Sequence, residues 1–66
     1  MLRTVGENIR KFRNERGLTQ MQLAIDADIP KSQVGRIERA EINTTISTLV
    51  KISTVLDIEI TRLFES

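Results

Sequence analysis

Residues 29–40, IPKSQVGRIERA, hold the side chains of this sequence that are best suited to chemistry. If Val34 and Ile37 face inward on a helix, their spacing turns one polar surface outward. That surface comprises Lys31, Ser32, Gly35, Arg36 and Arg39. Its groups donate hydrogen bonds, and an arginine can donate two at once to a planar acceptor pair such as O6 and N7 of guanine. The stretch therefore indicates recognition of a partner rather than catalysis.

Several classes of protein are excluded by composition. The 66 residues include no cysteine and no histidine. A disulfide framework and a thiolate metal site are therefore impossible, and the commonest metal ligand and general base is missing. No pair of carboxylates and no Ser–Lys pair has a spacing that suggests a catalytic site. We expect no enzyme activity, no metal and no cofactor.

The length predicts one small domain, residues 1–66. No apolar run approaches the roughly 18 residues that a membrane helix needs, and the N-terminal stretch lacks the apolar segment of a signal peptide. Residues 1–39 hold eight Lys/Arg and five Asp/Glu, a net charge of +3, whereas residues 40–66 hold two and four, a net charge of −2. We expect a soluble intracellular protein without a membrane partner, with a basic face on its N-terminal two thirds.

The apolar spacing predicts five short helices with no repeat and no linker between them. The first carries Val5, Ile9 and Phe12 and ends at Gly17, a residue suited to the left-handed position after a helix. The second begins at the capping box Thr19–Gln22. Its inner face consists of Leu23, Ala24 and Ala27.

The remaining helices follow from similar signals. Pro30 is expected as the first residue of the third helix, where its fixed φ is suitable. Thr44 or Thr45 caps a fourth helix, whose predicted inner residues are Ile46, Leu49, Val50, Ser53 and Leu56. A fifth turn carries Ile60, Leu63 and Phe64. The alternation in LDIEI leaves a brief strand open as an alternative.

Residues 20–39 combine a helix, a tight turn at Asp28 and a second short helix, which is the layout of a helix-turn-helix. The chain resembles the lambda-repressor-like (XRE-type) helix-turn-helix family over about residues 5–64. The matching pieces are LTQMQLA, VGRIERA, TLVKI and RLF. The resemblance implies a compact all-α fold of five helices.

Four residues depart from the family pattern. Asp28, Ala40 and Asp57 stand where glycine is commoner, and Pro30 replaces a serine or threonine cap. Aspartate tolerates the left-handed region better than most residues. These departures affect the expected geometry of the turns.

The resemblance implies that the helix at about residues 30–39 reads the major groove of DNA. Base contacts are expected from Lys31, Ser32 and Arg36, and also from Gln33, which leans toward the helix flank. Backbone contacts are expected from Gln20, Arg39, Asn43 and Thr44. A cation near the end of a helix also favours the helix dipole, so Arg39 has a second role. For Thr44 a turn or cap role is the alternative.

Gly35 is unusual because glycine inside a helix costs about 1 kcal/mol relative to alanine. Its predicted position on the outer polar face allows close approach of an external partner, here the wall of the groove. The alternative is a surface substitution that is merely tolerated.

Arg13 and Glu38 border the predicted core, since each follows an inward residue by four positions. A charge at that border requires a partner, because an unpaired buried charge is costly. The resemblance implies a structural ion pair between them that holds the recognition helix.

The resemblance also implies a sequence-specific regulator of transcription, a repressor that acts as a homodimer in the cytoplasm, on the nucleoid. Its target would be a near-palindromic operator with half-sites about 34 Å apart, one helical turn. A phage-type repressor, a restriction-modification controller and an antitoxin with a toxin as partner all fit. The alternative function is a protein-interaction module on the same fold without specific DNA binding.

Overall fold

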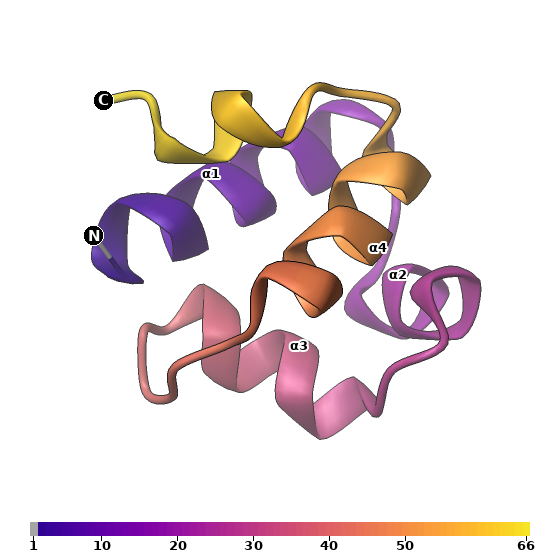
Figure 1. Cartoon of the computed structure of the whole chain (residues 1–66). Coiled ribbons are helices and arrows are strands. Elements are labelled where there is room, and N and C mark those ends of the chain that lie inside the picture. The colour runs from indigo at the N-terminus through magenta and orange to yellow at the C-terminus, as the bar shows by residue number, and fades with distance from the viewer. Residues whose placement is uncertain (1) are drawn as a thin grey trace.

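The computed structural model describes residues 2–66, so the first residue of the predicted domain lies outside it. The elements are α1 (Leu2–Glu15), α2 (Gln20–Ala27), α3 (Lys31–Glu38), α4 (Ile46–Leu56) and the 3-10 helix η1 (Ile60–Phe64) (Figure 1). The predicted all-α fold is confirmed across this part of the chain, but its fifth helix is a 3-10 helix rather than an α-helix. The LDIEI segment forms the end of α4, a turn and the start of η1, so no strand forms there. Within the described range, no helix is long and apolar enough to cross a membrane.

Polar side chains cap the N-termini of two helices. The capping box at α2 is confirmed: the Thr19 hydroxyl accepts from the Gln22 amide at 3.0 Å, and the Gln22 side chain accepts from the Thr19 amide at 2.8 Å. Thr45 caps α4, where its hydroxyl accepts from the Thr48 amide at 3.1 Å. Pro30 lies just before α3 rather than at its first position, so that expectation was wrong by one residue. A proline offers no side-chain acceptor, and only its carbonyl caps the helix.

Left-handed backbone follows each of the four α-helices. Gly17 has φ of 67°, and the three residues that replace glycine have nearly the same angle: Asp28 at 57°, Ala40 at 58° and Asp57 at 56°. This conformation costs an ordinary residue roughly 1–2 kcal/mol. The turns therefore keep the geometry that glycine would adopt, at an energetic cost.

The core lies between the helices and consists of buried apolar side chains. They are Val5, Ile9, Phe12, Leu23, Ala24, Ala27, Val34, Ile37, Leu49, Ile52, Leu56 and Leu63. The predicted inner face of α4 was partly wrong. Ile46 and Val50 are 64% and 46% exposed, whereas Ile52 is 1% exposed. The helix packs against α2, η1 and α1 through the stripe that contains Ile52, because these elements cover only one side of it.

Gly6 marks the place where α1 crosses α3. A Cβ atom on this residue would lie 2.5 Å from the carbonyl oxygen of Ile37 and 2.7 Å from that of Glu38. Both distances are shorter than van der Waals contact, and backbone atoms cannot yield as a side chain can. The sequence reading assigned no role to Gly6, but the approach of the two helices requires a residue without a side chain here.

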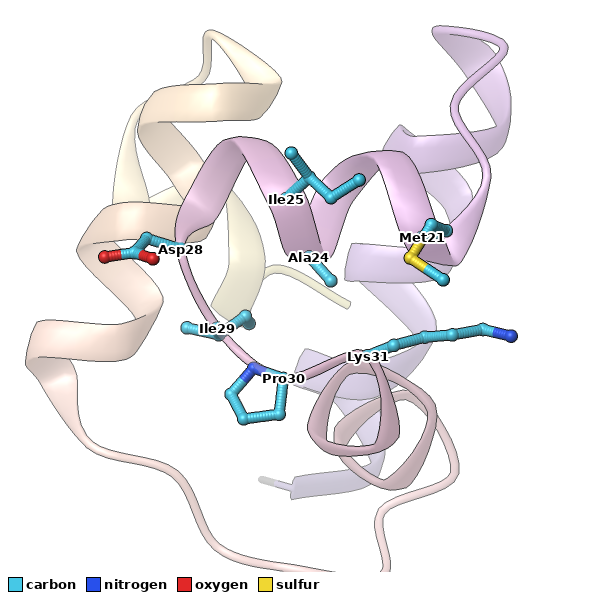
Figure 2. A pocket seen from close by; sticks show the side chains of 7 residues that line it. All are labelled: Met21, Ala24, Ile25, Asp28, Ile29, Pro30 and Lys31. Carbon is cyan, nitrogen blue, oxygen red and sulfur yellow. The ribbon is translucent and has the colours of Figure 1, made fainter.

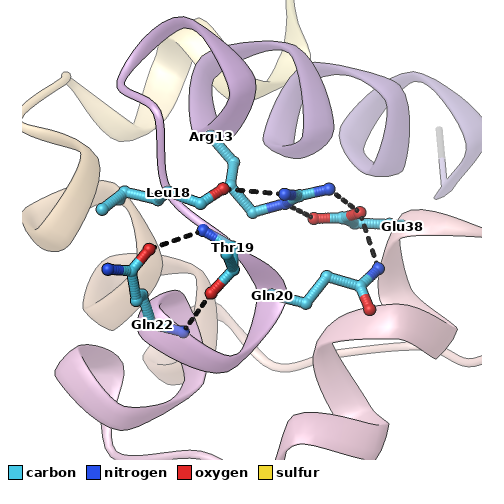
Figure 3. A network of polar contacts seen from close by, with 6 residues as sticks. All are labelled: Arg13, Leu18, Thr19, Gln20, Gln22 and Glu38. Carbon is cyan, nitrogen blue, oxygen red and sulfur yellow. Dashed lines mark hydrogen bonds and ion pairs between the residues drawn. The ribbon is translucent and has the colours of Figure 1, made fainter.

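A buried ion pair joins the same two helices (Figure 3). Arg13 donates from Nε and Nη2 to the two carboxylate oxygens of Glu38, at 2.7 and 3.1 Å. Its Nη1 donates to the carbonyl of Leu18 at 2.8 Å. The two side chains are only 11% and 3% exposed. The end of α3 is therefore tied to α1 and to the loop before α2.

We predict that Gly6→Ala destabilises the protein by roughly 1–3 kcal/mol, because the added methyl overpacks the helix crossing. Gly35→Ala is the matched control, since its added Cβ would meet the end of the flexible Arg39 side chain at 3.0 Å. That change should be neutral or stabilise by up to about 1 kcal/mol through helix propensity. Urea denaturation of both variants measures the difference. Equal effects of the two substitutions would contradict the close approach at Gly6.

The ion pair predicts a second stability result. Arg13→Met should cost about 3–5 kcal/mol because Glu38 would remain buried without its charged partner. Arg10→Met, an exposed site on the same helix, should change stability by no more than about 0.5 kcal/mol. The double variant Arg13→Met with Glu38→Leu should recover much of the loss, since both charges are then removed. Denaturant melts of all three proteins test this, and a double variant as unstable as Arg13→Met would refute the coupling.

Candidate nucleic-acid interface

The outward face of α3 carries most of the candidate base-reading side chains. Val34 and Ile37 are buried, which fixes the rotation of the helix about its axis. Lys31, Ser32 and Arg36 are exposed as a result. Gln33 is half-buried on the flank of the helix. The four candidates thus lie within less than two turns of one helix, three of them exposed and Gln33 partly buried.

Gly35 was expected on this exposed face, and that expectation was wrong, because Gly35 is buried. The side chains that cover it are polar: a Cβ here would lie 3.0 Å from Nη1 of Arg39 and 3.5 Å from Oε1 of Gln20. The absent side chain therefore makes room for two residues of the protein itself. Both are candidates for DNA-backbone contact.

Gln20 is the first residue of α2 and lies against the end of α3. Its Nε2 donates to Oε1 of Glu38 at 3.1 Å (Figure 3). The amides of a helix's first turn have no partner inside the helix, and the N-terminal end carries a partial positive charge that favours anions. A shallow hollow beside it includes Asn14, Gly17, Thr19 and Lys31 in its lining. This arrangement is suited to an anionic group such as a phosphate.

The loop between α3 and α4 holds the remaining candidates. Asn43 is exposed, whereas Thr44 is half-buried. The Oγ1 atom of Thr44 is fully buried and has no hydrogen-bond partner among residues 2–66. The Thr44 side chain would have to rotate before its hydroxyl could reach a phosphate.

Glu41 is a residue at this interface that sequence reasoning missed. Its Oε2 accepts from Nε of Arg39 at 2.6 Å, and its Oε1 lies 4.0 Å from Nε of Arg36. The hydrogen bond between Glu41 and Arg39 raises the pKa of Arg39 and lowers the pKa of Glu41. The available signal was Ala40 in the glycine position, since a left-handed residue there turns the chain back toward α3.

A groove between α2 and the start of α3 lies beside the interface (Figure 2). Met21 and Ile25 form its α2 wall, and Ile29 and Pro30 form the other. The ammonium of Lys31 points away from the groove rather than into it. The lining is mainly apolar and brings no set of polar groups together, so the groove offers no chemistry comparable to that of the α3 face.

Comparisons with known proteins identify the family of this domain. The sequence profile of the family described as helix-turn-helix matches residues 9–63. The immunity repressor protein of Bacillus phage phi105 is 40% identical over 60 residues, which cover 91% of this chain but only 42% of the repressor.

Two solved structures show the same fold. The restriction-modification controller protein C.AhdI from Aeromonas hydrophila superposes with a TM-score of 0.93 at 36% identity and covers 96% of both chains. The master regulator for biofilm formation SinR, in complex with DNA, gives a TM-score of 0.87 at 35% identity over 92% of this chain and 98% of that one. The chain belongs to the helix-turn-helix family of the lambda-repressor-like, XRE type.

Proposed function

We propose that this chain is a sequence-specific DNA-binding regulator of transcription, a repressor whose α3 enters the major groove. The observation that carries the proposal is the outward face of α3, on which Lys31, Ser32 and Arg36 are exposed while Glu38 is buried in an ion pair. An α-helix fits the major groove of B-DNA, and base edges there present acceptors to such donors. The SinR–DNA complex supports the proposal, because its domain has the same fold as this chain.

The phosphate contacts are assigned to residues around α3. Arg39 follows the helix and is exposed, and Gln20 lies at the start of α2 beside a shallow hollow. Asn43, and Thr44 after rotation of its side chain, would extend these contacts along the loop. Contacts of this kind set the register of a protein on the duplex but carry no sequence information. Specificity is therefore assigned to Lys31, Ser32, Gln33 and Arg36.

Two copies of the chain would be needed to read a whole operator. The described residues span 25 × 22 × 20 Å, and of their helices only α3 is proposed to enter the major groove. Half-sites of a near-palindrome are about 34 Å apart, which is more than one such domain can bridge. We therefore propose a homodimer on a near-palindromic operator, acting on the nucleoid in the cytoplasm. Selection of bound duplexes from a random pool tests DNA binding, palindromy and spacing together.

Arg36 and Arg39 should respond differently to truncation. Arg36→Ala should cost about 1–3 kcal/mol on the selected duplex and relax the preference at one base pair of each half-site. Arg39→Ala should weaken binding to all duplexes similarly and reduce the salt slope by about 1 per protomer, because a phosphate contact is lost. Binding titrations on selected and scrambled duplexes at several salt concentrations measure both effects. Equal losses for both variants on both duplexes would refute the base-reading role of Arg36. A wild-type protein that binds neither duplex preferentially would favour the protein-interaction alternative.

A larger residue at Gly35 should weaken DNA binding with little effect on the stability of the fold. Gly35→Leu should displace the Arg39 and Gln20 side chains that cover the glycine, while the buried residues of α3 keep their places. We expect a melting temperature within a few degrees of the wild-type value and a marked loss of affinity for the selected duplex. Gly35→Ala is the control, because one methyl needs only a small shift of Arg39. If the leucine variant melted normally and bound at full strength, Gly35 would have no role in the interface.

A further inference from the structure

The carboxylate of Glu41 lies close to both Arg36 and Arg39, the two arginines to which DNA contacts are assigned. Its Oε2 is 2.6 Å from Nε of Arg39, and its Oε1 is 3.4 Å from Nη2 of the same residue. The same Oε1 is 4.0 Å from Nε of Arg36. One acidic group therefore lies between a proposed base-reading side chain and a proposed phosphate contact.

The main chain brings Glu41 to this position. Ala40 adopts left-handed backbone at φ of 58°, and the Glu41 amide then donates to the carbonyl of Arg36 at 2.8 Å. This hydrogen bond closes the end of α3 in the manner of a Schellman turn and directs the chain back along the helix. The placement of Glu41 thus follows from the backbone and not only from a side-chain rotamer.

The ion pair between Arg39 and Glu41 contributes little to the stability of the fold. The Arg39 and Glu41 side chains are 58% and 48% exposed, and ion pairs that are this exposed contribute little to stability. An acidic side chain beside the phosphates of a duplex would also oppose binding by charge repulsion. The position of Glu41 is therefore explained neither by stability nor by general affinity for DNA.

The atoms involved suggest what Glu41 contributes instead. The nearest approach of Glu41 to Arg36 is the 4.0 Å between Oε1 and Nε, which is a charge contact and not a hydrogen bond. This contact is on the Nε side of the guanidinium, so Nη1 and Nη2 of Arg36 are left for end-on donation to a guanine. In contrast, Glu41 accepts hydrogen bonds from Nε and Nη2 of Arg39 and leaves Nη1 of that residue. In a complex with a specific duplex, Glu41 can therefore stay beside Arg36 while that arginine contacts a base. In a complex made only through phosphates, Glu41 still repels the phosphates and no base contact compensates for this repulsion.

We propose that Glu41 is a positioning residue that sets specificity: it orients Arg36 toward the base edges and lowers the affinity for arbitrary duplexes. The proposal rests on the proposed function, since it concerns the same DNA-binding face. It assigns to Glu41 a contribution to the ratio between specific and non-specific affinity, rather than to affinity itself.

The test compares Glu41→Gln with a matched control, Glu65→Gln. Glu65 pairs with Nε of Arg62 at 3.0 Å, and the two side chains are 61% and 49% exposed. This pair lies at η1, on the far side of α1 from α3 (Figure 1). Both variants lose one negative charge from an exposed Arg–Glu pair, so any difference between them reports position rather than net charge.

Dissociation constants are measured for the duplex selected by the wild-type protein and for a scrambled duplex, at several salt concentrations. Glu41→Gln should bind the scrambled duplex about three- to tenfold more tightly at low salt, because one nearby repulsive charge is removed. Its affinity for the selected duplex should rise by much less or fall, so the specificity ratio decreases. Glu65→Gln should leave that ratio unchanged, and both variants should melt like the wild type.

Two results would overturn the proposal. An unchanged ratio in Glu41→Gln would show that the carboxylate does not discriminate between duplexes, and an equal fall in Glu65→Gln would show an effect of net charge alone. Failure of the proposed function is distinguishable, because the wild-type protein itself would then prefer no duplex.

Discussion

An eight-residue helix does not persist alone in water, so α3 must be held by its neighbours. The bidentate pair between Arg13 and Glu38 holds its C-terminal end, and Glu38 also accepts a hydrogen bond from Gln20. Such a buried pair adds little net stability compared with apolar residues of similar volume, because both charges lose their hydration. It does require a defined geometry, since each donor and acceptor must meet its partner. The direction in which α3 points therefore depends on this pair.

The helix crossing at Gly6 imposes the same requirement through packing. Carbonyl oxygens of Ile37 and Glu38 occupy the space that a side chain at Gly6 would take, so α1 and α3 are close at the level of their backbones. The ion pair needs this proximity, because the Arg13 and Glu38 side chains must meet at 2.7 Å. A polar contact and a steric contact on the same two helices thus support one arrangement. Both contacts therefore determine the orientation of the exposed face of α3.

Local signals in the sequence were sufficient for most of the fold. The capping box at Thr19 and the left-handed residue Gly17 depend on a few neighbouring residues, and for this reason they could be predicted from the sequence. The left-handed backbone at Asp28, Ala40 and Asp57 could not be predicted in the same way, because none of these residues is a glycine. The inner face of α4 could not be read with equal success. Its apolar residues form two overlapping stripes at helical spacing, one with Ile46 and one with Ile52, and only the elements packed against α4 decide between them.

The candidate site shows the same limit of sequence reasoning. Helical periodicity places Gly35 outside the apolar stripe, but it cannot show that Gln20 from another helix and Arg39 from the next turn lie over it. Glu41 was missed because it follows the helix and has no periodic relation to it. Together these residues restrict side chains that would otherwise be mobile: Gly35 provides the space for Arg39, and Glu41 fixes the direction of its guanidinium. Ordering a long side chain before binding reduces the entropy that binding must offset. For contacts made only to phosphates, however, the negative charge of Glu41 opposes binding, so the net gain from ordering is expected in complexes that also include base contacts.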